Sequence, residues 1–505
     1  MNPIVETSYG KLAGVERNGV CRFRGIPFAQ PPIGGRRFQP PEPPQAWAGV
    51  RDASAFGRSA LQNASMLGPV AFDVGQTDED CLYLNVWTPA GDGARRPVMV
   101  WIHGGAFVLG SASQKLYSGE QLARRGDVVV VSINYRLGSF GYLNLHDVCG
   151  DGVPGGNQGV LDQIAALEWV RDEIAAFGGD PRNVTIFGES AGSISVATLL
   201  GVPRARGLFH RAILQSGSAN LVASREQSAR VADELLRELG VSARDLAALR
   251  QLPSQHILDA QLKVSLRLQP QLRGLPFAPS IDEDVLPRSP FDAIRGGSAK
   301  DVSVLAGSNL DEMKLFGLMD SGARSLDDAA LLKRCERNSP GHAERIIATY
   351  RSARAERRAS IEPSELWFAI ESDRTFRTPA MRLAELQRTH QPNTYTYLFT
   401  WPSPFMEGLL GACHALELPF VFGTFSDPMM GRFAGTGPAA DQLSEHIQEA
   451  WLTFAHSGRP GHLGLGDWPA YDSTRRATMI LDAECRIEHA PLEAERQAWA
   501  AVTHS

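Results

Sequence analysis

Residues 184–192 of the 505-residue chain read Val-Thr-Ile-Phe-Gly-Glu-Ser-Ala-Gly and contain its one match to the pattern Gly-x-Ser-x-Gly. The apolar run 184–187 predicts a strand, and residues 194–200 are compatible with a helix. A tight turn between such a strand and helix exposes a serine hydroxyl at the edge of a sheet. So sharp a turn leaves no room for a Cβ atom at Gly188 or Gly192. We therefore predict that Ser190 is a nucleophile.

Other short apolar runs, each followed by turn residues, surround this motif. The strands that we predict are residues 97–102, 127–133, 184–187, 302–306 and 394–399. Nearly continuous apolar strands indicate a sheet that is covered on both faces. Residues 158–177 carry apolar side chains at helical spacing between two of these strands. Strands that alternate with helices predict an α/β protein with a large, mostly parallel central sheet.

Two charge-rich segments, residues 224–295 and 325–388, are typical of helices that form excursions over such a sheet. The chain has no repeat, low-complexity tract or flexible linker. We therefore expect a single domain over residues 1–505, with these two segments as helical insertions.

The composition limits the classes of partner. The net charge is −6, with 43% hydrophobic and 21% charged residues. A negative net charge argues against a nucleic-acid partner, and the hydrophobic content is sufficient for a large core. The apolar runs are much shorter than the roughly 18 to 20 residues that cross a bilayer, so we expect no membrane span.

The cysteines and the N-terminal residues bear on the compartment. Six cysteines are scattered singly, without a Cys-x-x-Cys pair, which is more typical of reduced thiols than of a disulfide framework. Residues 1–7 contain neither the basic nor the apolar region of a secretory signal. We expect a cytoplasmic protein.

A serine nucleophile requires a base, an acid that orients the base, and donors for the developing oxyanion. Residues 103–107, His-Gly-Gly-Ala-Phe, follow a predicted strand and offer backbone N–H groups. The N–H groups of Gly105, Ala106 and Ala191 are the candidate oxyanion donors. We expect His103, which precedes the turn, to be a structural brace and not the base.

The residues alone leave more than one candidate for the acid and for the base. In this type of hydrolase the acid and then the histidine follow the serine in the chain. Asp311 and Glu312, after the predicted strand 302–306, are candidates for the acid. Among the twelve histidines, His414 lies between small residues, but the late His446 and His456 compete with it for the role of base.

Several ordered blocks of the chain resemble the type-B carboxylesterase and cholinesterase family, which has the α/β-hydrolase fold. The blocks are residues 23–29, 79–85, 103–107, 134–136, 188–192, 411–422, 451–455 and 468–471. The resemblance implies Ser190 as nucleophile, Glu312 as the orienting acid and His414 as the base. It also implies the three oxyanion donors named above, with Asp311 only a neighbour of the triad.

The same resemblance implies two buried structural ion pairs, Arg37 with Glu79 and Arg136 with Asp162. Three departures from the family pattern are visible. Residues 58–62 lack the thiol that the family often bridges to its Glu-Asp-Cys block, so Cys81 is expected to be free. Residues 59–78 lack the tryptophan with which cholinesterases hold a quaternary ammonium, so choline esters are not expected as preferred substrates. Ala106 stands where many relatives have a third glycine.

We therefore expect a serine esterase that is similar to bacterial para-nitrobenzyl esterases, acts on a small-molecule ester through an acyl-enzyme, and needs no cofactor or metal. Glu189 and Ser216 are expected to lie behind the reacting groups. Alternatives are a hydrolase of amides, carbamates or specialised esters such as phthalates, and a non-catalytic adhesion relative. The residues define neither the substrate preference nor the oligomeric state. Six side chains are candidate pocket liners or core residues: Phe107, Leu221, Phe316, Trp367, Phe368 and Trp401.

Overall fold

A computed structural model describes residues 2–64, 73–150, 153, 155–272 and 274–502 of the chain. The chain divides into two compact units, and each is described by itself. Unit 1 comprises Met1–Ile213, Leu221–Ser303 and Ala455–Gly458, and unit 2 comprises Leu214–Asn220, Val304–Phe454 and Arg459–Ser505. Two of the boundaries between the units fall inside the strands β12 (Arg211–Gln215) and β13 (Ser303–Asn309).

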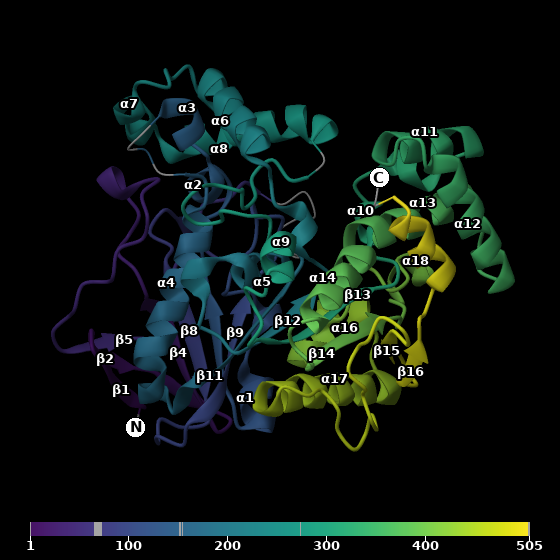
Figure 1. Cartoon of the computed structure of the whole chain (residues 1–505). Helices are drawn as coiled ribbons and strands as arrows, with labels where there is room; N and C mark the ends of the chain where they lie inside the picture. The colour runs from purple at the N-terminus through teal and green to yellow at the C-terminus, as the bar shows by residue number, and fades with distance from the viewer. Residues whose placement is uncertain (1, 65–72, 151–152, 154, 273, 503–505) are drawn as a thin grey trace. The chain divides into compact units, whose positions relative to one another are not determined.

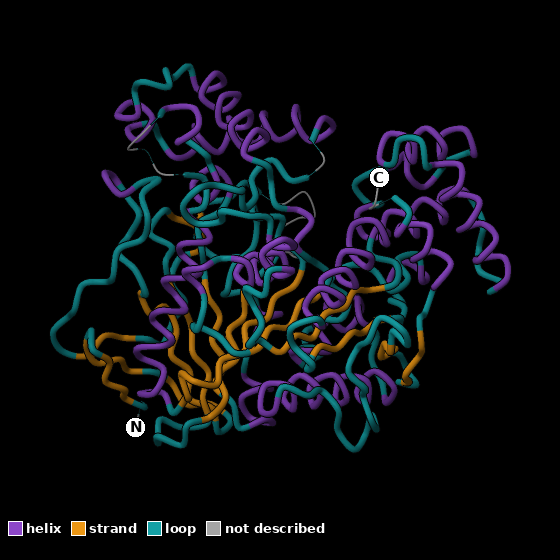
Figure 2. The backbone as a smooth tube through the Cα atoms, in the orientation of Figure 1, coloured by secondary structure: helices purple, strands orange, loops and turns teal. Residues whose placement is uncertain are grey.

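Unit 1 is built on a mixed sheet whose strands lie side by side in Figure 2. Its strand order is β3 (Val15–Arg17), β4 (Val20–Pro27), β8 (Tyr83–Thr88), β10 (Val129–Ile133), β9 (Arg96–Ile102) and β11 (Gly179–Glu189). Strands β10, β9 and β11 are parallel, whereas β3, β4 and β8 are joined in antiparallel pairs. All residues of β9 and β10 are buried, as expected for apolar strands covered on both faces.

Helices of unit 1 follow the sequence signals closely. The predicted helix 158–177 is α4 (Gln158–Glu173) followed by a 3₁₀ turn (Ile174–Phe177). The predicted helical segment 224–295 contains α6 (Arg225–Leu239), α7 (Leu246–Gln251), α8 (Ser254–Leu268) and α9 (Pro290–Arg295). The first of these begins with a reciprocal capping box between Ser224 and Gln227 and ends at Gly240, whose φ is 66°. Helices α6, α7 and α8 lie together with α3 (His146–Cys149) in Figure 1.

Unit 2 has its own set of paired strands. The parallel strands β13, β14 (Thr394–Phe399) and β15 (Ala477–Leu481) are followed by the antiparallel β16 (Arg486–His489). Its other elements include α10 (Met313–Phe316), α15 (Leu418–Phe422), α16 (Pro428–Ala434) and α17 (Pro438–Ser457). The last three residues of α17 lie outside unit 2. The segment 325–388 is helical, as predicted: α11 (Asp328–Asn338), α12 (Ala343–Glu356), α13 (Pro363–Ser372), a π-helix (Asp373–Arg377) and α14 (Thr378–Arg388).

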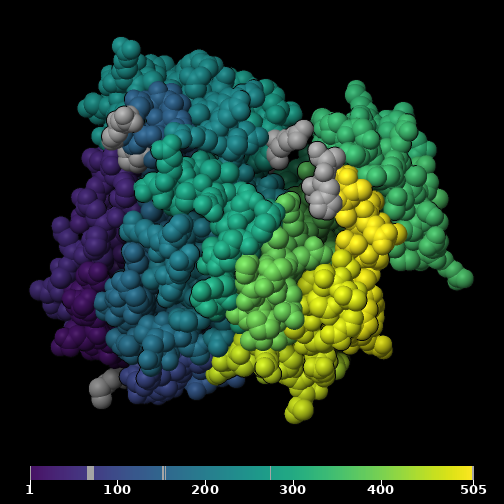
Figure 3. Space-filling model, viewed as in Figure 1, coloured from purple at the N-terminus to yellow at the C-terminus, as the bar shows by residue number. Residues whose placement is uncertain are grey.

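The C-terminal helix α18 (Glu493–Ala500) belongs to unit 2 and packs against α12. In Figure 3 the yellow C-terminal residues of this unit lie beside its green helical residues. Trp499 of α18 is buried in an apolar cluster with residues of α12 and α13, among them Tyr350, Trp367 and Phe368. The expectation of one domain over residues 1–505 stays a prediction.

Candidate active site

The predicted turn at Ser190 is present in unit 1. Strand β11 ends at Glu189, α5 (Ala191–Gly201) begins at Ala191, and Ser190 between them has φ 55° and ψ −123°. A positive φ is strained for a residue that has a Cβ atom, and such strained residues are common at functional sites. A Cβ on Gly192 would lie 2.0 Å from the carbonyl oxygen of Ile102, and one on Gly188 would lie 2.6 Å from the backbone of Gly192. The steric reason predicted for both glycines is confirmed.

The loop that follows β9 lies beside this turn. Strands β9 and β11 are parallel, and Gly188 is opposite Ile102 in their register, so both strands end at the same edge of the sheet. Three successive residues of the loop, Gly105, Ala106 and Phe107, have φ values of 114°, 53° and 60°. A Cβ on Gly104 would lie 3.1 Å from the Cβ of Ser190. The loop therefore contacts the nucleophile candidate.

Ala191 is the first residue of α5, so its N–H group has no acceptor four residues earlier in the helix. The carbonyl of Gly105 accepts hydrogen bonds from the N–H groups of Val108 and Leu109, at 3.0 and 2.9 Å, which closes the loop on itself. This arrangement provides a helix N-terminus and a tight loop next to one serine. Both features suit the stabilisation of negative charge.

His103 has the properties of a brace, as predicted. Its ring stacks on Tyr135 at a centroid distance of 4.6 Å, and its Nδ1 atom lies 2.8 Å from the carbonyl oxygen of Gly104. The hydroxyl of Tyr135 donates to the carbonyl oxygen of His103 at 2.8 Å. Burial lowers the pKa of His103 to about 4, so its ring is neutral near pH 7.

The acid and base candidates meet in unit 2. The Nδ1 atom of His414 lies 2.5 Å from Oε2 of Glu312, and both side chains are buried. The backbone N–H of Asn309 donates to the other carboxylate oxygen of Glu312 at 2.7 Å. A carboxylate held in this way fixes the tautomer of the imidazole and leaves Nε2 available for a proton.

The competing residues make other contacts. Asp311 accepts a hydrogen bond from the N–H of Ala412 at 3.0 Å and pairs with Lys314 at 3.3 Å. The ring of His446 lies 5.6 Å from that of His462, and Nε2 of His456 lies 2.8 Å from the carbonyl oxygen of Gly126. Of the candidates left open by chain order, Glu312 and His414 are the two in contact with each other.

A second buried carboxylate lies close to this pair and was missed by sequence reasoning. Glu417 accepts hydrogen bonds from Nδ2 of Asn309 at 2.7 Å and from Nε2 of Gln215 at 3.1 Å. Burial, followed by the negative charge of Glu312, raises the pKa of Glu417. Its position three residues after His414, inside the block 411–422, is the one signal that the sequence offered.

Two further predicted positions are buried. Glu189 packs against the loop after β9, because a Cβ on Gly104 would lie 2.9 Å from its Oε2 atom. Ser216 follows β12 with φ 53°, and its N–H group donates to the carbonyl oxygen of Gly307 at 2.9 Å. Its hydroxyl has no hydrogen-bond partner among the described residues.

Three of the candidate pocket liners have clear positions. Phe316 lies on His414, with ring centroids 5.0 Å apart. Trp367 and Phe368 belong to the apolar cluster around Trp499 and are core residues. Phe376, which no sequence signal singled out, also lies on His414, at 4.9 Å.

Both ion pairs implied by the family resemblance are confirmed. Arg136 donates to both carboxylate oxygens of Asp162, at 2.7 and 2.8 Å, and their side chains are 3% and 0% exposed. Arg37 donates to both carboxylate oxygens of Glu79 through its Nε and Nη2 atoms. Its Nη1 atom donates to the carbonyl oxygens of Arg250 and Leu252.

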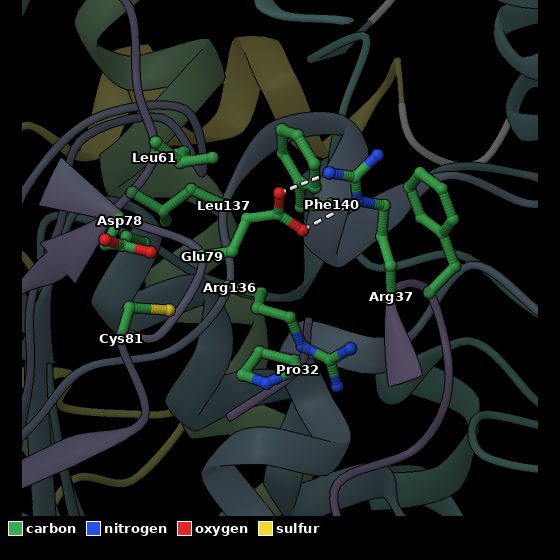
Figure 4. A pocket seen from close by; sticks show the side chains of 11 residues that line it. Pro32, Arg37, Leu61, Asp78, Glu79, Cys81, Arg136, Leu137 and Phe140 are labelled. Carbon is green, nitrogen blue, oxygen red and sulfur yellow. Dashed lines mark hydrogen bonds and ion pairs between the residues drawn. The ribbon is translucent and has the colours of Figure 1, made fainter. Parts of the chain in front are cut away.

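A small pocket of unit 1, drawn in Figure 4, is lined by residues of both ion pairs. The free thiol of Cys81 lies in its wall, and burial raises the pKa of that thiol well above its usual value. The expectation that Cys81 is unbridged is confirmed. The region with the missing tryptophan, residues 59–78, lies partly outside the described residues, because 65–72 are not described. None of the helices in the described part of the chain is both long and apolar enough to cross a bilayer.

A strained serine between a buried strand and a helix is typical of serine hydrolases on an α/β sheet. The chain belongs to the carboxylesterase family, whose family model matches residues 1–499. It is 41% identical to the para-nitrobenzyl esterase of Bacillus subtilis over 98% of both chains, and 35% identical to phenmedipham hydrolase of Pseudarthrobacter oxydans over 95% of both.

A crystal structure of a carboxylesterase from Geobacillus stearothermophilus is similar over 98% of this chain and 99% of that one, with a TM-score of 0.88 and 41% identity. The predicted α/β-hydrolase fold is confirmed, and the protein is a carboxylic ester hydrolase.

Proposed function

We propose that the protein hydrolyses carboxylic esters through an acyl-enzyme formed on Ser190, with His414 as general base and then acid. Glu312 is the carboxylate that orients His414. The observation that carries this assignment is the 2.5 Å contact between Nδ1 of His414 and Glu312, made by two buried side chains. The strained elbow at Ser190 supports its role as the nucleophile.

In this mechanism Ser190 attacks the ester carbonyl while Nε2 of His414 accepts its proton. The imidazolium is stabilised by its hydrogen bond to Glu312 and returns the proton to the leaving alcohol. Water then repeats the sequence and frees the acid. The N–H groups of Gly105, Ala106 and Ala191 form the proposed oxyanion hole, where the loss of one donor typically costs about 10²- to 10³-fold in rate.

The first test replaces the nucleophile. Ser190→Ala is expected to lower turnover of 4-nitrophenyl acetate by up to ~10⁶-fold. Ser195→Ala, which removes a buried hydroxyl from the same helix, is the control and retains turnover. A small phosphonate should add one adduct mass, on the peptide that contains Ser190. Activity of a folded Ser190→Ala protein would place the chemistry on another residue.

The second test separates the two neighbouring carboxylates. Glu312→Gln removes the charge that holds His414 and is expected to lower kcat about 10³- to 10⁴-fold. Asp311→Asn changes a carboxylate one residue away that contacts Ala412 and Lys314, and should cost far less. A larger loss for Asp311→Asn would contradict the assignment.

The substrate class is proposed from the relatives. Para-nitrobenzyl esters are the first probes, because the Bacillus subtilis relative carries that substrate in its name. A panel of aryl and alkyl esters, amides and carbamates defines the preference. All six cysteines are free thiols, which supports a reducing compartment and hence the proposed cytoplasmic location. Cell fractionation tests that location.

A further inference from the structure

Two phenyl rings lie against the imidazole of the base candidate. The rings of Phe316 and Phe376 lie 5.0 and 4.9 Å from that of His414, tilted by 44° and 41°. The two phenyl rings are nearly parallel to each other, at 7° and 6.3 Å. Such contacts restrict the rotation of the imidazole, and aromatic faces attract a cation.

Phe376, which contacts His414, lies in a π-helix, an element that is rare in proteins. The π-helix at Asp373–Arg377 joins α13 to α14 without a break in the helical backbone. A π-turn contains one extra residue, so the side chains after it are rotated by about 100° from the positions of an uninterrupted α-helix. The extra residue is costly in a helix, and such turns occur frequently at functional sites.

A buried polar cluster anchors the π-helix. Arg377 donates to both carboxylate oxygens of Asp373 at 2.6 Å. The hydroxyl of Tyr350, from α12, donates to Asp373 at 2.5 Å, and Nε1 of Trp499, from α18, donates to the same hydroxyl at 2.8 Å. We name these four residues the Asp373 cluster.

Every member of the Asp373 cluster is at least 95% buried. A buried ion pair with two additional hydrogen-bond partners has one well-defined geometry, because any displacement leaves a charge or donor unpaired. The cluster therefore fixes the π-helix against α12 and α18. Phe376 belongs to the same π-helix and follows Asp373 by three residues.

We infer that Phe376 is a positioning residue for His414, and that the Asp373 cluster, through the π-helix, holds its ring against the imidazole. The inference rests on the proposed role of His414 as the base. During acyl transfer His414 gains a proton, and the two rings then face a cation. Glu312 and Glu417 are the carboxylates near the same imidazole, and they are unchanged by the substitutions below.

The direct test is Phe376→Leu, which keeps an apolar side chain and removes the ring. The loss of one cation–aromatic contact is expected to lower kcat about 2- to 30-fold. Because the effect acts on the base, the factor should be the same for 4-nitrophenyl acetate and 4-nitrophenyl hexanoate. A loss that grows with acyl length would make Phe376 a substrate contact and overturn the inference.

The second test acts at a distance and has a matched control. Tyr350→Phe removes the hydroxyl at the centre of the Asp373 cluster. Tyr471→Phe removes a buried hydroxyl that donates to the carboxylate of Glu385 at 3.2 Å, elsewhere in the same unit. Both variants should lower the temperature of unfolding, but only Tyr350→Phe should lower kcat, by about threefold or more, and move the acid limb of the pH profile of kcat/KM.

The outcomes separate this inference from the proposed function. Loss of activity in Ser190→Ala with wild-type kcat in folded Phe376→Leu would refute the positioning role alone. A loss in Phe376→Leu without one in Tyr350→Phe would refute the anchoring by the cluster. Retained activity in Ser190→Ala would instead refute the proposed function on which both depend.

Discussion

The substitution Gly192→Ala tests the packing of the nucleophile turn without touching a reacting group. The new Cβ would lie 2.0 Å from the carbonyl oxygen of Ile102, 2.9 Å from the carbonyl carbon of Ile102 and 3.0 Å from that of His103. All three atoms belong to backbone, so no side-chain rotation relieves the contact. Raising 2.0 Å to the shortest distance that real Cβ atoms show, 3.0 Å, requires a relative shift of about 1 Å between α5 and the end of β9.

The expected cost has two parts. Overpacking of this kind typically lowers the free energy of unfolding by about 1 to 3 kcal/mol. A shift of about 1 Å at a reacting group can lower the rate about 10²-fold. The measurements are urea unfolding and kcat/KM with 4-nitrophenyl acetate. Gly35→Ala is the control, because a Cβ there meets no atom within 4 Å. Wild-type stability and turnover in Gly192→Ala would refute the steric account of this glycine.

Three other predictions concern buried groups that take no part in the proposed reaction. Asp162→Asn leaves Arg136 without its buried partner and should lower the free energy of unfolding by about 3 to 5 kcal/mol, measured in urea, while the folded fraction keeps its kcat. The folded pKa of His103, about 4, lies below its ordinary 6.5, so the unfolded state binds the proton first as the pH falls. The contribution of His103 to the free energy of unfolding is complete above pH 6.5, and in the wild type it should fall by about 3 kcal/mol towards pH 4. The His103→Gln variant should lack this pH dependence, and its absence from the wild type would contradict the prediction. Iodoacetamide at pH 8 should leave Cys81 unmodified, as judged by peptide mass, until the protein is unfolded, because burial disfavours its thiolate; fast labelling in the native state would contradict this.

The nucleophile turn could be predicted from local signals, because each of them has a steric or conformational cause. A β-branched run, a glycine on either side of the serine and a helix-compatible segment all point to the same geometry. The structure places β11 and α5 at these positions, with Ser190 in the strained conformation between them. The predicted strand 394–399 matches β14 residue for residue.

The choice between Asp311 and Glu312 could not be made from local residues, since both follow the same strand. It depends on which side chain turns towards a histidine about 100 residues later, and therefore on the packing of two distant segments. Only the family resemblance pointed to Glu312. The roles of both residues in catalysis stay a prediction.

The contact of Phe376 with His414 had no sequence signal at all. Phe376 lies within a π-helix, an element for which the sequence carries no recognised signal. The four side chains that anchor this turn come from three elements spread over residues 350–499, so only the folded chain brings them together.

The Arg37–Glu79 pair stands next to an unbridged Cys81, in a segment where relatives often have a disulfide. One guanidinium ties together the chain at residue 37, the carboxylate at 79 and the carbonyl groups at 250 and 252. A covalent disulfide crosslink is opened by thiols, whereas an ion pair contains no bond that a thiol can reduce. The attachment of this segment is therefore expected to be unaffected by dithiothreitol.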